Sequence, residues 1–158
     1  MASSGTLLAN NQVHDVARPQ DQLTGDARGD FILEGLQAAG LLQQDGKFKV
    51  DLLKVQHHGS ARDDTQNFFE TVVADHYVIS ANGKYDNPDM ETLQMLSDTR
   101  GNEEFTLYLT NREGENNLGN RLTGFFAQEK SQGKRYKVIC REDPALSVKA
   151  DLLTAVNY

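Results

Sequence analysis

The chain has 158 residues, and its 23 acidic and 16 basic side chains give a formal net charge of −7. This length suits one domain with a single core, and a hydrophobic content of 38% favours folding over disorder. The acidic balance argues against binding of nucleic acid through a basic surface.

No apolar run approaches the roughly 20 residues that cross a bilayer, so we expect no membrane contact through a helix. The first residues, MASSGTLLANNQ, lack a basic region followed by an apolar stretch, so a cytoplasmic location is predicted. Cys140 is the only cysteine, which excludes an intrachain disulfide and a cysteine-rich zinc site. Its place in YKVIC predicts a buried structural thiol.

The N-terminal half of the chain is predicted to alternate strands and helices. Residues 1–22 are interpreted as a poorly ordered lead-in, in which SSGTLLA has the composition of a first strand. A helix is predicted over residues 26–39, with Asp26 near its start and Gly40 at its end. A strand, a helix and a further strand follow over residues 48–55, 63–75 and 76–81.

The C-terminal half continues the same pattern. NGKYDNPD has the dipeptides of a loop, and Asp89 is expected to cap a helix over residues 90–98. A strand over 105–111, a helix carrying Leu122, Phe125 and Phe126, and strands over 134–142 and 146–156 complete the chain. The alternation predicts one α/β domain over residues 23–158, with a mixed sheet and helices packed on it.

Two short motifs follow predicted strands, LTGD ending at Asp26 and VQHHGS containing His57 and His58. Ligands of α/β sheets bind beyond the carboxyl ends of strands, and carboxylate and imidazole groups suit Zn²⁺, Fe²⁺ or Mn²⁺. Simpler readings stay open, because Asp26 and Ser60 suit helix caps and an adjacent histidine pair is often solvated. His14 and His76 give no comparable indication of function.

Three segments together resemble the C-terminal half of metallo-β-lactamase-fold hydrolases. LTGDARGDFILEGL, VDLLKVQHHGS and HYVISANGKYDNPDMETLQML are similar in order and spacing to the competence-associated, ComEC-like branch over about residues 22–97. The resemblance implies that Asp26 bridges two metal ions and that His57 or His58, with His57 preferred, binds one of them. It also implies a zinc, manganese or iron cofactor that activates water for hydrolysis of an ester, lactone or phosphodiester, and places Ser60 near the substrate.

The family's N-terminal motif, His-x-His-x-Asp-His, does not occur in this sequence. We therefore expect a partial metallo-β-lactamase-like αβ(βα) layer, incomplete for catalysis alone and with no catalytic residue assigned. The missing sheet would leave an apolar face, which predicts a homo-oligomer or a complementary N-terminal half. Two alternatives remain: an active hydrolase completed by a partner or by Asp30, Asp63 or Asp64, and a non-catalytic binding or assembly module that holds no metal.

Overall fold

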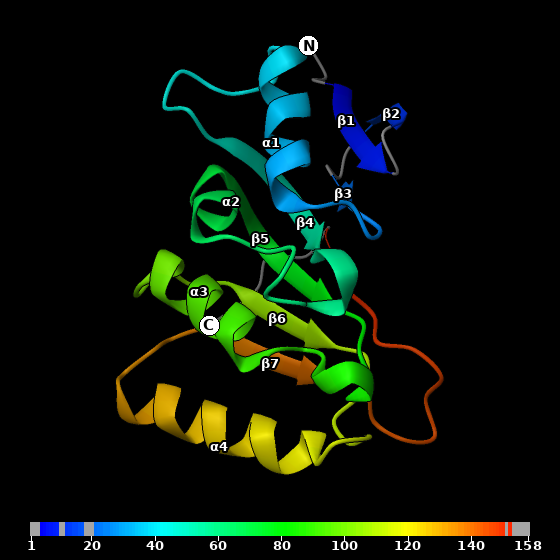
Figure 1. Cartoon of the computed structure of the whole chain (residues 1–158), viewed down its shortest axis with the longest axis vertical. Coiled ribbons are helices and arrows are strands. Elements are labelled where there is room, and N and C mark those ends of the chain that lie inside the picture. Colours follow the sequence, from blue (N-terminus) through cyan, green and yellow to red (C-terminus); the bar gives the residue numbers. More distant parts are fainter. Residues whose placement is uncertain (1–3, 10–11, 18–20, 151, 153–158) are drawn as a thin grey trace.

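A five-stranded sheet forms the centre of the computed structural model, which describes residues 4–9, 12–17, 21–150 and 152 (Figure 1). The strand order follows the chain, and the strands are β3 (Asp21–Leu23), β4 (Phe48–Lys54), β5 (Val72–Ile79), β6 (Thr106–Leu109) and β7 (Lys137–Cys140). A separate antiparallel hairpin of β1 (Ser4–Ala9) and β2 (Gln12–Ala17) precedes the sheet. β1 lies within the segment whose composition suggested a first strand, and β3 spans the boundary expected between residues 22 and 23.

All four neighbouring strand pairs of the large sheet are parallel. The α/β class is confirmed, whereas the predicted mixed sheet is wrong for the described strands. The physical reason lies in the connections, because each one contains a helix that returns the chain to the end of the sheet where the previous strand began. These helices are α1 (Gly29–Ala38), α2 (Gln66–Thr71), α3 (Met90–Arg100) and α4 (Leu118–Ser131).

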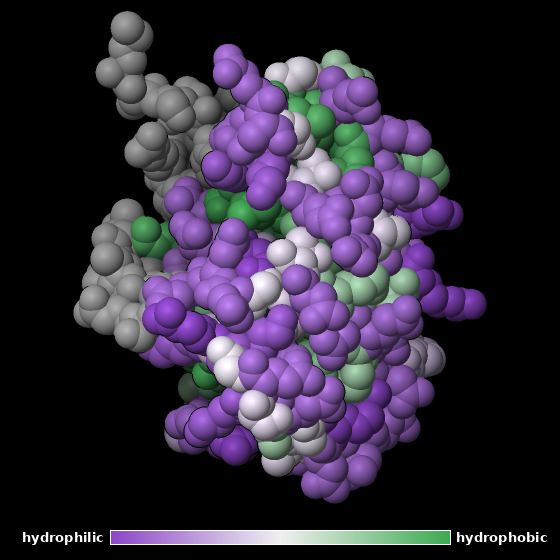
Figure 2. Space-filling view, turned by 90° about the vertical axis from the view of Figure 1, so that its left-hand side faces the viewer, coloured by the Kyte–Doolittle hydropathy of each residue, from purple (hydrophilic) through white to green (hydrophobic). Residues whose placement is uncertain are grey.

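The four helices cover one face of the sheet (Figure 1). Right-handed crossovers between parallel strands are the rule, and with strands in chain order they place every helix on the same side. Each helix contributes two apolar side chains to one core cluster, namely Ile32, Leu36, Phe68, Phe69, Leu93, Leu96, Leu118 and Leu122. Viewed from the left-hand side of Figure 1, the molecule presents a mostly hydrophilic surface (Figure 2).

Element boundaries differ from the prediction in several places. Helix α1 begins at Gly29 rather than Asp26, because Gly25 adopts a left-handed conformation (φ 57°) and the Ala27 N–H donates to the Thr24 carbonyl in a turn. Val72 and Val73 belong to β5 rather than to the preceding helix. Residues 146–150 and 152 are not in a strand; the other residues of the predicted strand over 146–156 lie outside the described part.

Candidate functional site

The loops that carry the two predicted motifs meet at one edge of the sheet. β3 and β4 are parallel neighbours, so the segments after Leu23 and Lys54 leave the sheet side by side. The Thr24 hydroxyl donates to the Lys54 carbonyl at 2.7 Å, and the His57 N–H donates to the Gly25 carbonyl at 3.0 Å. The Asp26 loop and the histidine loop are therefore joined by hydrogen bonds at their bases.

His57 lies in a short 3₁₀ turn, η1 (Gln56–His58), with an unusual backbone conformation. Its φ of 40° and ψ of 44° are left-handed, and His58 and Gly59 follow with φ values of 59° and 77°. Positive φ is uncommon outside glycine, and such strain gathers at ligand-binding and catalytic positions. The three residues reverse the chain tightly enough to hold both imidazoles at the edge of the sheet.

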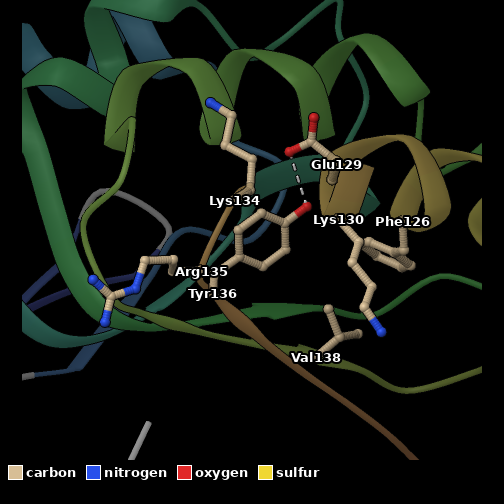
Figure 3. Close-up of a pocket in the computed structure, with 7 residues that line it drawn as sticks. All are labelled: Phe126, Glu129, Lys130, Lys134, Arg135, Tyr136 and Val138. Atoms are coloured by element: carbon tan, nitrogen blue, oxygen red, sulfur yellow. Dashed lines mark hydrogen bonds between the residues drawn. The ribbon is translucent and has the colours of Figure 1, made fainter. Parts of the chain in front are cut away.

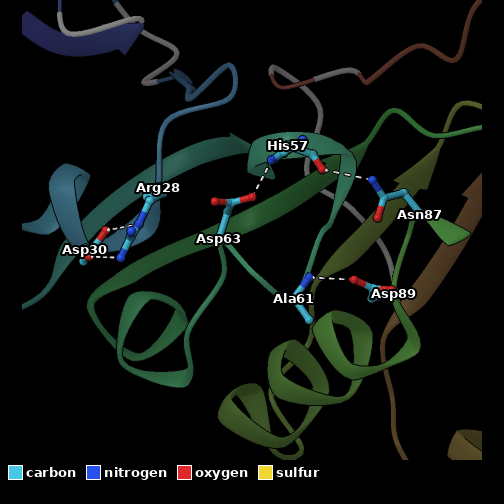
Figure 4. A network of polar contacts seen from close by, with 7 residues as sticks. All are labelled: Arg28, Asp30, His57, Ala61, Asp63, Asn87 and Asp89. Carbon is cyan, nitrogen blue, oxygen red and sulfur yellow. Dashed lines mark hydrogen bonds and ion pairs between the residues drawn. The ribbon is translucent and has the colours of Figure 1, made fainter. Parts of the chain in front are cut away.

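The His57 ring is paired with a carboxylate. Its Nδ1 donates to Asp63 Oδ2, and the His57 side chain is 46% exposed while that of Asp63 is 14% exposed (Figure 4). A carboxylate that is ionised can only accept, so Nδ1 carries the hydrogen. His57 Nε2 makes no hydrogen bond with any described residue, so its lone pair is not used within the described part of the chain.

The His58 ring is also held through its Nδ1 atom, but by a different group. Its Nδ1 donates to the Ser80 carbonyl, which can only accept, so Nε2 again carries no hydrogen in the neutral ring. The two ring centroids lie 6.3 Å apart with an interplanar angle of 63°. Both histidines thus use Nδ1 internally, which is the arrangement usual for histidines that bind metal through Nε2.

The histidine loop is fixed to the loop after β5. The Asp89 N–H donates to the Gly59 carbonyl at 2.9 Å, and the Asp89 carboxylate accepts the Ala61 N–H at 2.9 Å (Figure 4). The Asn87 amide contacts the His57 carbonyl at 3.5 Å. Asp89 is the N-cap residue of α3, as predicted, but its side chain makes no cap bond to the helix.

Ser60 is buried inside the same turn. Its N–H donates to the His57 carbonyl at 3.1 Å, and its own carbonyl accepts the N–H groups of Asp63 and Asp64. These backbone contacts make Ser60 part of the turn that presents the histidines. A contact of its hydroxyl with substrate stays a prediction.

Asp26 is exposed and makes no cap bond to α1, so the helix-cap reading of this residue is wrong. Arg28 occupies the cap position instead, also without a side-chain cap bond. Burial lowers the pKa of Lys54, while the negative charges of Asp26 and Asp64 act to raise it. The Asp26 carboxylate therefore lies within electrostatic reach of the β4 end that leads into the histidine loop.

The three alternative ligands occupy very different positions. Asp30 pairs with Arg28 at 2.6 Å on the surface (Figure 4). Asp63 contacts His57. Apart from the Asp-Asp doublet that begins six residues after His57, nothing in the sequence indicated this pair. Asp64 is only 3% exposed, and burial raises its pKa to about 8. Neither Asp64 oxygen has a hydrogen-bond partner among the described residues, although the Thr92 hydroxyl lies close enough to act to lower the pKa.

The remaining candidates lie away from this edge. His14 is in β2 opposite Leu7, and its side chain lies outside the described part. His76 is buried on β5 against Tyr108, with ring centroids 5.7 Å apart. Cys140 is half-buried, which raises the pKa of its thiol, so full burial was not correctly predicted.

A pocket of about 330 Å³ lies at the opposite end of the sheet, between the end of α4 and the start of β7 (Figure 3). The Tyr136 hydroxyl donates to the buried Glu129 carboxylate at 3.1 Å, and Ser97 donates to the same oxygen. Burial, and then the Glu129 charge, raises the pKa of Tyr136. Since ligands of parallel sheets bind at the carboxyl ends of strands, this pocket is separate from the candidate site.

The basic residues near that pocket are mostly engaged with acidic neighbours. Lys134 lies 3.5 Å from Asp98, and Arg135 lies 2.8 Å from Glu104.

The donor set at the β3–β4 edge fits part of a metal site. Asp26 offers carboxylate oxygens and His57 offers a free imidazole nitrogen, both of which Zn²⁺ accepts. Within the described ranges, no group of three or more His, Cys, Asp or Glu residues is placed to hold a metal ion. The described residues therefore supply fewer ligands than the three that a catalytic zinc usually has.

Comparisons with protein-family models, with curated proteins and with solved structures found no match. None of the described helices combines the length and the apolar character needed to cross a bilayer.

Proposed function

We propose that this chain carries the C-terminal part of a metallo-β-lactamase-like hydrolase site and is incomplete for catalysis on its own. Asp26 and His57 are the proposed metal ligands, with His58 beside them. Zn²⁺ is the proposed ion, and Mn²⁺ or Fe²⁺ are alternatives with compatible ligand preferences. The supporting observation is the hydrogen bond between His57 and Gly25, which joins the two motif loops while His57 Nε2 stays free.

A bound ion would supply Lewis-acid activation of water for hydrolysis of a phosphodiester or ester. The chain's own contribution is positional, because η1 fixes both rings and Asp63 and Ser80 fix their tautomers. The ligands that are missing from the described residues would come from a complementary N-terminal half or from a second copy of the chain. An active hydrolase assembled in this way is the catalytic form of the same proposal.

A second candidate is a binding or assembly module that has kept the fold without the chemistry. The observation that favours it is the lack of a three-ligand group in the part of the chain that the structure describes. The two candidates differ in whether the isolated chain holds a metal ion at Asp26 and His57.

Calorimetric titration of metal-stripped protein with Zn²⁺ distinguishes the metal site from the metal-free assembly module. We expect one ion per chain, and we expect Asp26→Ala and His57→Ala each to weaken binding about tenfold or more, because each removes a ligand. Asp30→Ala is the matched control, since it removes an exposed carboxylate that pairs with Arg28. If zinc binds the parent chain and all three variants equally weakly, the metal site is contradicted and the assembly module is favoured.

A further inference from the structure

β7 is the last strand of the large sheet, and among the described strands it pairs only with β6. The Lys137 N–H donates to the Phe105 carbonyl at 2.9 Å, which begins the ladder between the two strands. Alternate residues of a strand bond to opposite sides, so the backbone N–H and carbonyl groups of Val138 and Cys140 point away from β6. β7 therefore presents backbone donors and acceptors at the outer edge of the sheet.

The two edges of the sheet are protected in different ways. At the opposite edge, β1 of the hairpin contacts β3. At the outer side of β7, no described strand is present, and the strand itself is short and contains an exposed lysine, Lys137. Short edge strands and lysine side chains discourage indiscriminate pairing. They leave the edge open to a strand that carries the complementary charge.

The pocket of about 330 Å³ adjoins this edge. Val138 belongs to both features, because its side chain packs on the helical side of the sheet and lines the pocket. Figure 3 shows Phe126, Lys130 and Val138 on the same side of the Tyr136 ring, which stacks on Phe105 with centroids 4.6 Å apart. A strand paired with β7 would bring one of its side chains to this pocket, and the aromatic and aliphatic lining favours an apolar one.

The charges around β7 select an acidic partner. Lys130 at the pocket and Lys137 on the strand are exposed and have no acidic partner among the described residues, whereas Lys134 and Arg135 are already paired. Side chains alternate along a strand, so Lys137 lies on the sheet face opposite to Val138. A strand in which acidic and apolar residues alternate matches both faces at once.

We propose that β7 and the adjoining pocket bind an extended acidic segment of a partner protein, which pairs with β7 as a further strand. The backbone of Val138 and Cys140 supplies hydrogen bonds, the pocket accepts one apolar side chain, and Lys130 and Lys137 attract the carboxylates. This surface goes beyond the proposed hydrolase site, since β5 and β6 lie between β7 and the β3–β4 edge.

Fluorescence anisotropy with labelled synthetic peptides tests this surface on the full chain. The probe is EVEFEVE, in which the glutamates fall on one face of an extended strand and the apolar residues on the other. We expect saturable binding with a Kd below about 100 μM. KVKFKVK, with reversed charge, and EVEFEVE carrying N-methyl groups on alternate amides should each bind at least about tenfold more weakly. Binding of KVKFKVK as tight as that of EVEFEVE, or no binding of EVEFEVE, overturns the proposal.

Substitutions and amide NMR shifts locate the peptide. Lys130→Glu and Lys137→Glu should each weaken EVEFEVE binding about fivefold or more, because each replaces an attracting charge by a repelling one. Lys84→Glu, at an exposed position of the loop after β5, is the matched control and should change the affinity less than twofold. In the parent chain, the amides of Val138 and Cys140 should shift on binding. Equal effects of the three substitutions, or shifts confined to other strands, contradict the proposed surface.

A second copy of the chain is the other occupant that this edge accommodates. Val138→Pro removes an outward N–H group, and proline is tolerated at such positions of edge strands. We expect this variant to lose EVEFEVE binding and to keep the mass of the parent chain in light scattering, with circular dichroism showing that the fold is retained. A parent dimer that dissociates in Val138→Pro would identify the second copy as the occupant and overturn the proposal of a partner protein.

Discussion

At the scale of single residues, Asp63 and Asp64 show how adjacent identical side chains take different chemical roles. Asp63 lies beside a histidine that donates to it, whereas Asp64 points into the protein with no hydrogen-bond donor on either oxygen. Burial disfavours the charged form, and the pKa of Asp64 is raised to about 8. Asp64 is therefore largely a neutral acid at pH 7.

Asp64 should make the stability of the protein decrease with rising pH. The folded state binds this proton more tightly than the unfolded chain, where aspartate titrates near 3.8, so the contribution is complete below about pH 4 and is lost as pH rises through 8. At 1.36 kcal/mol per unit of pKa, the loss approaches roughly 6 kcal/mol. Urea unfolding at pH 5, 7 and 9 measures this loss of unfolding free energy.

Asp64→Asn keeps the shape of the side chain and cannot ionise. We expect its unfolding free energy to fall much less between pH 5 and 9 than that of the parent chain. Asp75→Asn, at an exposed position of β5, serves as the control and should follow the parent profile. Parallel profiles for the parent chain and Asp64→Asn would show that Asp64 is ionised in the folded state.

The site could be predicted from sequence only where a motif carries it. Asp26, His57 and His58 were identified because LTGD and HHGS follow strands, and the structure brings these two loops together. The partners of the histidines could not be predicted. Asp63 is one of many acidic residues in the chain, and the Ser80 carbonyl is a backbone group that any residue would provide.

At the scale of elements, helix α2 depends on an N-terminal cap by Thr65, whereas the sequence analysis had considered Ser60 as a helix cap. Thr65 is extended, and its hydroxyl accepts the Phe68 N–H at 3.2 Å. The helix has only six residues, yet it delivers Phe68 and Phe69 to the core. A helix this short is marginal without such a cap and without packing of its apolar side chains.

We expect Thr65→Ala to lower the free energy of unfolding by about 1 kcal/mol, because it removes the side-chain cap and leaves the Phe68 N–H with the Thr65 carbonyl as its acceptor. Asp26→Ala should change it by less than about 0.5 kcal/mol, since Asp26 is exposed and caps nothing. Denaturant titration of both variants gives the comparison. A larger cost for Asp26→Ala than for Thr65→Ala would restore the capping role to Asp26.

Element types were easier to predict than element ends. β4 and α3 agree with their predicted ranges because their apolar residues recur at strand or helix spacing. Val72 and Val73 were assigned to a helix because they continue the spacing of Phe68 and Phe69. They lie in β5, where both pair with β4, and only that tertiary pairing decides between the two states.

At the scale of the whole molecule, the sheet is packed by helices on one face. Leu52, Val78 and Ile139 alternate with the core residues of their strands, are half-buried and lie outside the core cluster, whereas His76, Thr106 and Tyr108 on the same face are buried. The alternation of strands and helices in the sequence was sufficient to predict an α/β fold. The same alternation also implies a parallel sheet, because helical crossovers join parallel strands. The prediction of a mixed sheet did not take this rule into account.

Association through the other sheet face is the expected consequence. Light scattering during size exclusion should give a mass that is a multiple of 17.6 kDa, or a complex when a complementary half is supplied. Ile139→Lys should weaken that association, while Glu34→Lys on exposed α1 should not. A 17.6 kDa species that remains alone under every condition would contradict the expectation of a partner.

The central claim is that the loops after β3 and β4 together hold one metal ion. The most direct measurement is anomalous X-ray scattering at the zinc edge from crystals of the zinc-saturated protein. We expect a peak about 2.0–2.2 Å from both an Asp26 oxygen and His57 Nε2. Saturated crystals with zinc elsewhere, or with Asp26 and His57 directed apart, would contradict it.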